Sequence, residues 1–233
     1  MRIHYLQHVA FEGAANILAW AEERGHAVTS TRFDLGQPLP EPTAFDWLVV
    51  LGGPMNVYEH ETYPWLAAEK RFLGNAIRRG AGVLGVCLGA QLAADVLGGR
   101  VTRNPQKEIG WFPVSLTAEG AGTPWFRGFP GSFTAFHWHG DTFSIPPGGV
   151  RLAASEACGN QAFCYGDRVL GLQFHLDYSQ QSIEQMIAHC ADELLPGPAV
   201  QAAAELRSTA ARVAEIRRLL ERLLDAMAAG LEK

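Results

Sequence analysis

A cysteine stands between two glycines directly after an apolar run, in Val83-Leu-Gly-Val-Cys87-Leu-Gly-Ala-Gln91. An apolar strand followed by Gly-x-Cys-x-Gly predicts a sharp strand-to-helix turn that presents the Cys87 thiol, a nucleophile elbow with Cys in place of Ser. Gly85 and Gly89 leave room for two backbones to cross, and the N–H of Leu88 then points to where an oxyanion would form. A buried structural thiol fits the same segment. The segment alone therefore leaves a nucleophile and a packed cysteine as alternatives.

A second apolar run ends in a histidine and an acid, in Val169-Leu-Gly-Leu-Gln-Phe-His175-Leu-Asp177. A thiol nucleophile needs a base that takes its proton, and the base needs an acceptor that fixes its tautomer. If the two strands lie close together in a parallel sheet, Cys87 and His175 emerge at the same carboxyl edge, where the active sites of such sheets lie. Taken alone, His175 fits a strand-end histidine that bonds the backbone, and Asp177 fits the N-terminal cap of a helix. Together with Cys87 they predict a Cys-His-Asp triad.

The elements that must position these residues alternate between strand and helix in the first half of the chain. Continuous apolar strands between helices predict a mostly parallel sheet covered on both faces. After Gly98-Gly99 the segments become aromatic and β-branched, which predicts hairpins or a mixed extension of the sheet. The expected strands are 2–9, 26–33, 46–53 and 82–86, the expected helices 13–24, 63–79, 88–97, 179–194 and 199–229, and the mixed β segments 100–117, 132–145 and 151–174.

The last expected helix carries a narrow apolar stripe, with Leu206, Val213, Leu220 and Met227 seven residues apart. Core-facing amphipathic helices are common, which favours packing of this helix onto its own domain. A helix–helix contact in a homodimer is the alternative. We divide the chain into a domain at 1–196 and a C-terminal amphipathic helix at 197–233.

The bulk composition is that of an ordinary soluble globular protein. The chain has 233 residues, of which 48% are hydrophobic, and a formal net charge of −5. Mild acidity without a Lys/Arg cluster argues against a nucleic-acid partner. We expect no membrane association, because no apolar segment reaches spanning length and the N-terminus has no signal-peptide pattern.

The cysteine and histidine spacings argue against a metal centre. Four cysteines without paired spacing predict reduced thiols in a cytoplasmic protein rather than a disulfide framework or a zinc site. His137 and His139 could share one strand face as metal ligands, but no third ligand has convincing spacing, and catalytic zinc normally takes three protein ligands. We therefore predict that the protein binds no metal.

Three segments of the chain, in this order, resemble motifs of the class I glutamine amidotransferase family. They are Gly52-Gly53-Pro54 after an earlier strand, Gly85-Val-Cys87-Leu-Gly89-Ala-Gln91, and Gly171-Leu-Gln-Phe-His175-Leu-Asp177. The resemblance spans about residues 45–178. Within the family the chain looks most like stand-alone, GMP-synthase-like amidotransferase domains. The segments that support this resemblance are Gly53-Pro-Met-Asn-Val-Tyr, Lys107-Glu-Ile-Gly-Trp and Trp138-His-Gly-Asp-Thr-Phe143. This resemblance implies an α/β fold of the flavodoxin-like three-layer type, in which helices cover both faces of a mostly parallel sheet. A mixed β extension continues the sheet, and the long C-terminal helix is added to it.

The resemblance also implies a reaction that needs no cofactor. Cys87 would attack the side-chain amide of glutamine and form a γ-glutamyl thioester, and His175 would protonate the departing ammonia and then activate water. The family commonly carries Pro and then Glu after this histidine, whereas Leu176 and Asp177 stand here. The implied site residues are Cys87, His175 and Asp177 as the triad, the backbone N–H groups of Gly53 and Leu88 as the oxyanion hole, and Gly52, Gly53, Gln91, Gly140 and Asp141 as the substrate-binding set.

Three functions stay open on the sequence. The first is glutamine hydrolysis that delivers ammonia to an acceptor, with a synthase partner protein supplying the second reaction. The second is a free-standing hydrolase that cuts γ-glutamyl peptides or conjugates, since only the leaving amine differs. The third is a non-catalytic binding module that keeps the fold, and its support is the change from Glu to Asp177.

Overall fold

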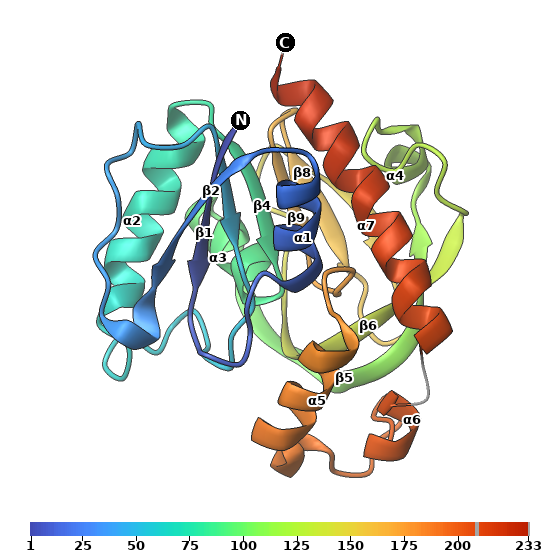
Figure 1. Cartoon of the computed structure of the whole chain (residues 1–233). Helices are drawn as coiled ribbons and strands as arrows, with labels where there is room; N and C mark the ends of the chain where they lie inside the picture. Colours follow the sequence, from blue (N-terminus) through green and yellow to red (C-terminus); the bar gives the residue numbers. More distant parts are fainter. Residues whose placement is uncertain (208–209, 233) are drawn as a thin grey trace.

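The computed structural model describes residues 1–207 and 210–232, and its strands form one sheet (Figure 1). The order across this sheet is β2-β1-β3-β4-β9-β8-β7-β5-β6. Neighbouring strands are parallel from β2 to β9 and antiparallel from β9 onward. The strands are β1 (Arg2–Gln7), β2 (Ala27–Arg32), β3 (Trp47–Val50), β4 (Gly82–Val86), β5 (Val101–Leu116), β6 (Ser132–Phe143), β7 (Gly149–Ala154), β8 (Ala162–Tyr165) and β9 (Val169–Leu172).

Helices cover both faces of the parallel half of the sheet. The α-helices are α1 (Ala15–Glu23), α2 (Trp65–Arg78), α3 (Leu88–Val96), α4 (Ala118–Gly122), α5 (Gln180–His189), α6 (Ala203–Arg207) and α7 (Ala210–Leu231), and the 3-10 turns are η1 (Phe33–Leu35) and η2 (Ala191–Glu193). The predicted fold class, a mostly parallel sheet with a mixed β extension and a C-terminal helix, is confirmed.

Alternate residues of the central strands enter two separate hydrophobic cores. In β3, Trp47 and Val49 belong to the core shared with α1 and α7, whereas Leu48 and Val50 belong to the core under α2 and α3. Side chains of a strand alternate between the two faces of a sheet, so a strand with both faces covered must be apolar throughout. This explains why the central strands read as continuous apolar runs.

The strand–helix alternation of the first half is interrupted between β2 and β3, where no helix was expected and the described chain forms the 3-10 turn η1 and a loop. One expected element differs in the structure. The last helix does not begin at residue 199. Ile109 N–H donates to the Ala199 carbonyl at 2.8 Å and Gln201 N–H donates to the Ile109 carbonyl at 2.9 Å, which keeps 199–201 extended beside β5. Within the expected helix, residues 208–209 lie outside the described residues.

The strand that precedes His175 is also shorter than the apolar run in the sequence. β9 ends at Leu172, because β4 ends one residue before the elbow and offers no further backbone partner. The last hydrogen bond between the two segments is donated by Cys87 N–H to the Leu172 carbonyl, at 2.7 Å. Beyond it, His175 exchanges backbone hydrogen bonds with Phe136 of β6, at 2.8 and 3.2 Å. The residues after β9 therefore join the parallel and antiparallel halves of the sheet.

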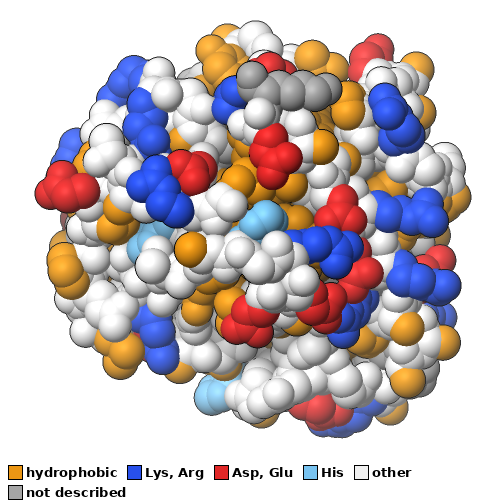
Figure 2. All heavy atoms as spheres, turned by 45° about the horizontal axis from the view of Figure 1, so that its top comes forward, with side chains coloured by type: hydrophobic (Ala, Val, Ile, Leu, Met, Phe, Trp, Pro, Cys, Tyr) orange, Lys and Arg blue, Asp and Glu red, His pale blue; other side chains and the backbone are white. Residues whose placement is uncertain are grey.

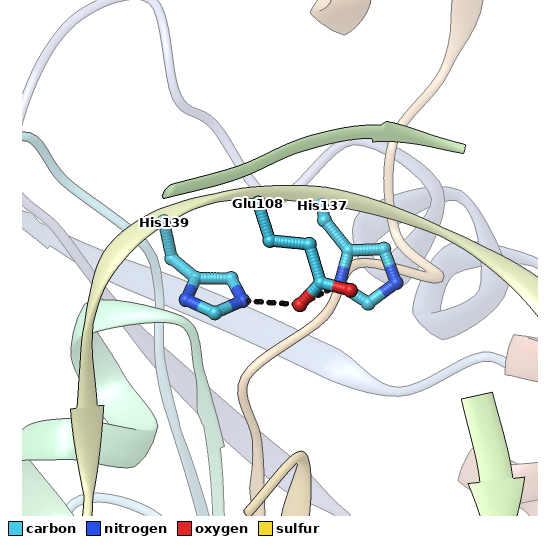
Figure 3. A group of neighbouring side chains, drawn as sticks. All are labelled: Glu108, His137 and His139. Carbon is cyan, nitrogen blue, oxygen red and sulfur yellow. Dashed lines mark hydrogen bonds and ion pairs between the residues drawn. The ribbon is translucent and has the colours of Figure 1, made fainter. Parts of the chain in front are cut away.

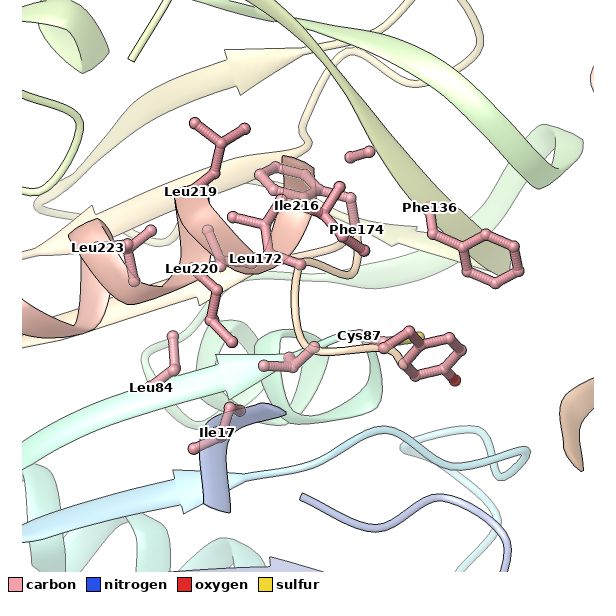
Figure 4. Packing of buried hydrophobic residues seen from close by; sticks show 14 of the residues in the cluster. Ile17, Leu84, Cys87, Phe136, Leu172, Phe174, Ile216, Leu219, Leu220 and Leu223 are labelled. Atoms are coloured by element: carbon pink, nitrogen blue, oxygen red, sulfur yellow. The ribbon is translucent and has the colours of Figure 1, made fainter. Parts of the chain in front are cut away.

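Helix α7 packs onto its own domain, as the favoured prediction had it. Ile216, Leu219, Leu220 and Leu223 lie over the side chains of Leu84 and Leu172 in the same core (Figure 4). Ion pairs from Arg24 to Asp225 and from Arg217 to Glu23 fasten the helix to α1. The homodimer contact stays a prediction.

The surface and the helices agree with the bulk composition. Figure 2 shows Lys and Arg side chains interspersed with Asp and Glu over one face of the molecule. Within the described residues, no helix has both the length and the apolarity that crossing a bilayer requires.

Candidate active site

Cys87 occupies the strained turn that its flanking glycines predict. It lies between β4 and α3 with φ +51° and ψ −108°, a backbone conformation that side chains rarely adopt. A methyl group on Gly89 would overlap the Val50 carbonyl oxygen, and one on Gly85 would overlap the Gly89 carbonyl. Only glycine fits these two crossings. The elbow places the thiol at the N-terminus of α3, where unpaired N–H groups favour negative charge.

His175 and Asp177 form a buried ion pair at the same sheet edge. His175 Nδ1 lies 3.1 Å from Asp177 Oδ1, and both side chains are almost fully buried. Burial alone would lower the pKa of His175, but the Asp177 carboxylate outweighs it and, with the nearby Cys87, raises that pKa to about 10. The imidazole is therefore cationic at neutral pH.

The thiol and the imidazole come together through the pairing of β4 with β9. Cys87 Sγ lies 3.6 Å from the Trp138 carbonyl oxygen and 3.7 Å from Gln173 Nε2, which donates to it. His175 Nε2 is buried and has no hydrogen-bond partner in the described residues. A catalytic hydrogen bond is often long or misaligned before substrate binds. His175 Nε2 is therefore left for the nearby Cys87 thiol or for a substrate.

A buried histidine fixes the peptide that carries the predicted oxyanion-hole N–H. His8 Nδ1 donates to the Gly52 carbonyl at 2.8 Å, and His8 Nε2 lies 2.8 Å from Glu69 Oε1. In a trans peptide the next N–H points away from the carbonyl, so the N–H of Gly53 faces the opposite side from His8. A methyl group on Gly53 would come within 3.1 Å of the Leu88 side chain. The two predicted oxyanion-hole residues are thus neighbours.

Two of the predicted substrate-binding residues are tied together on the opposite wall. Gln91 Nε2 donates to the Asp141 carbonyl at 3.3 Å and to Gln173 Oε1 at 3.2 Å. The Asp141 carboxylate accepts a hydrogen bond from Tyr58 at 3.1 Å. Gly140 precedes Asp141 on β6 and lies beside the Lys107 side chain. All three residues reach the same cavity as Cys87.

This cavity has a volume of about 250 Å³ and includes walls that no sequence motif indicated. Glu12 comes from the loop between β1 and α1, and it follows a strand whose carboxyl end lies at the active edge. Its place after a strand end could have indicated a site residue, but no local sequence pattern distinguishes Glu12 from other acids. A further part of the wall comes from α5, from η2 and from Cys190 between them, and consists of Met186, Cys190, Asp192 and Glu193.

A buried acid stands beside the two histidines that were considered as metal ligands. Glu108 Oε2 lies 3.0 Å from His139 Nε2 and 3.5 Å from His137 Nδ1 (Figure 3). The third residue that sequence spacing did not supply comes from β5, which pairs with β6 across an irregular register between Arg103 and Glu108. These three side chains are a group that could hold a metal ion.

Hydrogen bonding accounts for most of this cluster. His139 Nδ1 donates to the Asp141 carbonyl at 3.0 Å, and Gln161 Nε2 donates to Glu108 Oε2 at 2.6 Å. Burial alone would raise the pKa of Glu108, but the hydrogen bond from His139 and the two neighbouring imidazoles outweigh it and lower that pKa. The carboxylate therefore holds His139, which in turn holds the backbone of Asp141. Absence of a metal stays a prediction.

Comparison with known proteins agrees with this geometry. The family model described as Glutamine amidotransferase class-I matches residues 13–193. The chain is 36% identical over 216 residues to a putative glutamine amidotransferase-like protein, YfeJ, of Salmonella typhimurium, covering 89% of this chain and 90% of that protein. It is 34% identical to one of the subunits of the glutamine-hydrolysing GMP synthase of Sulfurisphaera tokodaii, over 60% of this chain and 72% of that relative. The structure of a glutamine amido transferase from Methylobacillus flagellatus superposes with a TM-score of 0.91 at 29% identity, covering 98% of this chain and 94% of that one.

Proposed function

The chain belongs to the class I glutamine amidotransferase family, whose members are cysteine-nucleophile amide hydrolases, and we propose that it releases ammonia from glutamine through a triad of Cys87, His175 and Asp177. The observation that carries the proposal is the meeting of the elbow and the buried ion pair at one edge of the sheet. There the strained Cys87, at the end of β4, lies near His175, which follows the neighbouring strand β9 and is paired with Asp177.

The first half-reaction breaks the C–N bond. Cys87 sulfur attacks the side-chain carbonyl carbon, and negative charge moves to the carbonyl oxygen, where the N–H groups of Gly53 and Leu88 stabilise it. His175 Nε2 gives its proton to the amide nitrogen as that bond breaks. Ammonia departs and a γ-glutamyl thioester remains.

The second half-reaction returns the enzyme to its starting state. Neutral His175 takes one proton from water, whose oxygen attacks the thioester carbon. The C–S bond breaks and returns the thiolate, and the new carboxyl group loses the second proton to solvent as glutamate is released. Asp177 accepts the Nδ1–H throughout, which keeps Nε2 on the reacting side. The shorter acid serves this role because its carboxylate already lies 3.1 Å from Nδ1.

We propose that Gln91, Gly140 and Asp141 hold the amino-acid end of the substrate, with Gly52 and Gly53 on the other side of the scissile amide. Gln91, Gly140, Asp141 and Gly53 line the cavity beside Cys87, and a methyl group on Gly52 would lie 3.6 Å from the Cys87 Cβ atom. A relative is named as part of a GMP synthase of more than one chain, and on that ground we propose a synthase partner that receives the ammonia.

Hydrolysis of γ-glutamyl peptides or conjugates is the second candidate. The observation in its favour is the cavity wall of Met186, Cys190 and Asp192. This wall comes from α5, η2 and the residue between them, and not from the elements that carry the triad. The same thioester would form on Cys87, and a larger amine would leave.

One experiment separates these functions. Purified protein is incubated with glutamine and with a panel of γ-glutamyl amides and peptides, and glutamate release is measured for wild type, Cys87→Ser and Cys87→Ala. Release from glutamine supports the amidotransferase, and release mainly from peptides supports the conjugate hydrolase. If no substrate is turned over and a glutamine-like electrophile fails to label Cys87, even with candidate partners present, the protein is a non-catalytic binding module.

A further inference from the structure

An aromatic side chain outside the triad covers one face of the His175 imidazole. Tyr178 has 2% of its surface exposed, and the centroid of its ring lies 4.0 Å from that of His175, with 36° between the ring planes. Aromatic pairs ordinarily lie about 4.5–7 Å apart. At the shorter separation the two rings meet face to face rather than edge to face. The Tyr178 ring therefore blocks movement of the imidazole toward that side.

The other contacts of the imidazole lie at its edges. Asp177 Oδ1 is 3.1 Å from Nδ1, and a methyl group on Gly52 would lie 3.4 Å from Cε1. A hydrogen bond weakens steeply only when its angle is poor, and it tolerates a broad range of directions above that limit. The bond to Asp177 therefore fixes the position of Nδ1 better than the direction in which Nε2 points. A contact on the ring face supplies the missing restraint.

The hydroxyl end of the Tyr178 ring is tied to a second loop of the site. It donates to Glu12 Oε2 at 3.4 Å, and Glu12 is itself buried in the loop between β1 and α1. Burial and the nearby Glu12 and Asp177 carboxylates raise the pKa of Tyr178 well above its usual value, so the hydroxyl keeps the proton that it donates. A methyl group on Gly52 would overlap the same Glu12 oxygen. The tip of the ring is thus held beside the Gly52–Gly53 peptide.

The backbone on both sides of the Tyr178 ring is also fixed. Asn16 N–H donates to the Asp177 carbonyl at 3.1 Å, and the Asn16 side chain donates to the Tyr178 carbonyl at 3.0 Å. Ala15, the residue before Asn16, has φ +38°, a conformation that costs energy and needs the surrounding structure to hold it. On the other side, Ser179 is the N-cap of α5 and forms a capping box there. The ring therefore has little freedom to leave the imidazole.

We infer that Tyr178 is a positioning residue for the proposed reaction, in which its ring keeps His175 Nε2 directed toward the Cys87 sulfur and the departing nitrogen. The inference rests on the proposed function, because it needs His175 as the group that transfers the proton. The face of an aromatic ring carries the negative part of its quadrupole, which attracts a cation. Tyr178 therefore favours both the direction and the charge that the first half-reaction requires of His175. The hydrogen bond to Glu12 in turn sets the position of the Tyr178 ring.

The first test compares turnover with substrate binding in variants of the ring. Tyr178→Met replaces the ring with a flexible apolar chain, and Tyr178→Phe keeps the ring without the hydroxyl. The matched control is Phe45→Met, because Phe45 is a buried ring that stacks on His4, a histidine outside the triad, at a centroid distance of 5.8 Å. For each protein, kcat on glutamine is expressed per Cys87 that a glutamine-like electrophile labels at completion, so unfolded protein does not contribute.

Tyr178→Met should lower kcat per labelled site by about 10–10²-fold with KM little changed, because a small misplacement of a catalytic group is costly. Tyr178→Phe should lie closer to wild type, and Phe45→Met should match it. The dependence on pH separates positioning from packing, because losing the ring removes an attraction for the cationic imidazole. The basic limb of kcat/KM should move about one pH unit lower in Tyr178→Met and should stay in place in Tyr178→Phe. Both variants leave unchanged the other titratable groups that face His175, which are Glu12, Cys87, His137 and Asp177.

The outcomes that overturn the positioning role differ from failure of the function. If wild type releases glutamate and Tyr178→Met keeps its kcat per labelled site within about twofold or its basic limb in place, Tyr178 does not position His175. The same conclusion follows if Phe45→Met shows equal changes. Should Tyr178→Met fail to fold, Tyr178→Leu is the second ring-free variant and must show the same loss and shift, and a limb that moves in Tyr178→Phe also contradicts the role of the ring. If wild type releases no glutamate and Cys87 is not labelled, the proposed function itself fails.

Discussion

His8 Nδ1 donates to the Gly52 carbonyl at 2.8 Å, and this hydrogen bond determines which way the Gly52–Gly53 peptide faces. Burial alone would lower the pKa of His8, but the Glu69 carboxylate and the Gly52 carbonyl outweigh it and raise that pKa. The ring is also stacked between Phe33 and Trp65. A fixed backbone donor costs no reorganisation when charge develops on the substrate.

Replacing His8 should therefore reduce turnover more than substrate binding. His8→Phe leaves the Glu69 carboxylate buried without its partner, so the double variant His8→Phe/Glu69→Leu is the better test. We expect kcat to fall about 10²-fold or more, the usual cost of an impaired oxyanion hole, with KM little changed. His4→Phe is the matched control, because His4 is a buried histidine of β1, the strand that His8 follows, and it bonds Thr29 and Thr31 instead. Equal losses in the control and the double variant would contradict this role.

Removing the acid of the triad should change both the rate and its dependence on pH. Asp177→Asn is expected to lower kcat by about 10³–10⁴-fold, because an amide favours the wrong tautomer of His175. Loss of the carboxylate also removes the main cause of the raised pKa, so the basic limb of the kcat/KM profile should move from near pH 10 to lower pH. Asp177→Glu should retain most activity and the basic limb. An unchanged profile in Asp177→Asn would show that this pair does not set the ionisation of His175.

The same pair should stabilise the fold at low and neutral pH and lose that contribution in base. The pKa of His175 is raised from 6.5 to about 10 in the folded protein, so its contribution is complete below pH 6.5 and disappears as pH rises through 10. Urea titrations at several pH values should show this loss in wild type and a smaller one in Asp177→Asn. A larger loss in the variant would contradict the assignment.

His137 should make the fold sensitive to acid. Burial lowers the pKa of His137 to about 4, despite the opposing charge of Glu108, so the native state holds the neutral ring. The unfolded chain gains that proton first as pH falls, and stability should decrease from pH 6.5 to 4 by up to about 3 kcal/mol. His137→Leu should flatten this part of the stability profile in urea titrations. If the two profiles run parallel, another group causes the acid sensitivity.

The crossing of backbones at the elbow should tolerate no side chain. Gly89→Ala places a methyl group on the Val50 carbonyl, and β3 and α3 cannot separate without opening the core between them. We expect a loss of at least 1–3 kcal/mol, measured as a lower midpoint of unfolding. Gly122→Ala, where the space around the glycine is open, should have a midpoint close to wild type. A normal midpoint for Gly89→Ala would mean that the two elements are less tightly packed than the structure shows.

Residues that follow a strand directly could be predicted from the sequence, because strand ends determine their place. Cys87 and His175 each end a continuous apolar run, and a parallel sheet brings such ends to one edge. His8 and Glu12 follow β1 in the same way, but their roles depend on Gly52 and Tyr178, which are distant in the chain. A single sequence holds no signal for such contacts.

The residues beyond the strand ends were harder to predict for similar reasons. Glu108 joins His137 and His139 only through the irregular pairing of β5 with β6, whose register sequence spacing does not reveal. Residues 199–201 were predicted to begin a helix, but backbone hydrogen bonds with Ile109 hold them extended. In both places tertiary pairing outweighs the local pattern.

The parallel pairing of Gly85 with Gly171 also governs the order in which the chain can fold. β4 is made early in synthesis, but its neighbour β9 emerges only after the whole antiparallel half has been translated. Until then one edge of an apolar strand stays unpaired, and such edges recruit other chains. Long-range parallel pairs also close slowly. The nascent chain should therefore depend on chaperones until β9 arrives, and fragments that end before residue 169 should aggregate.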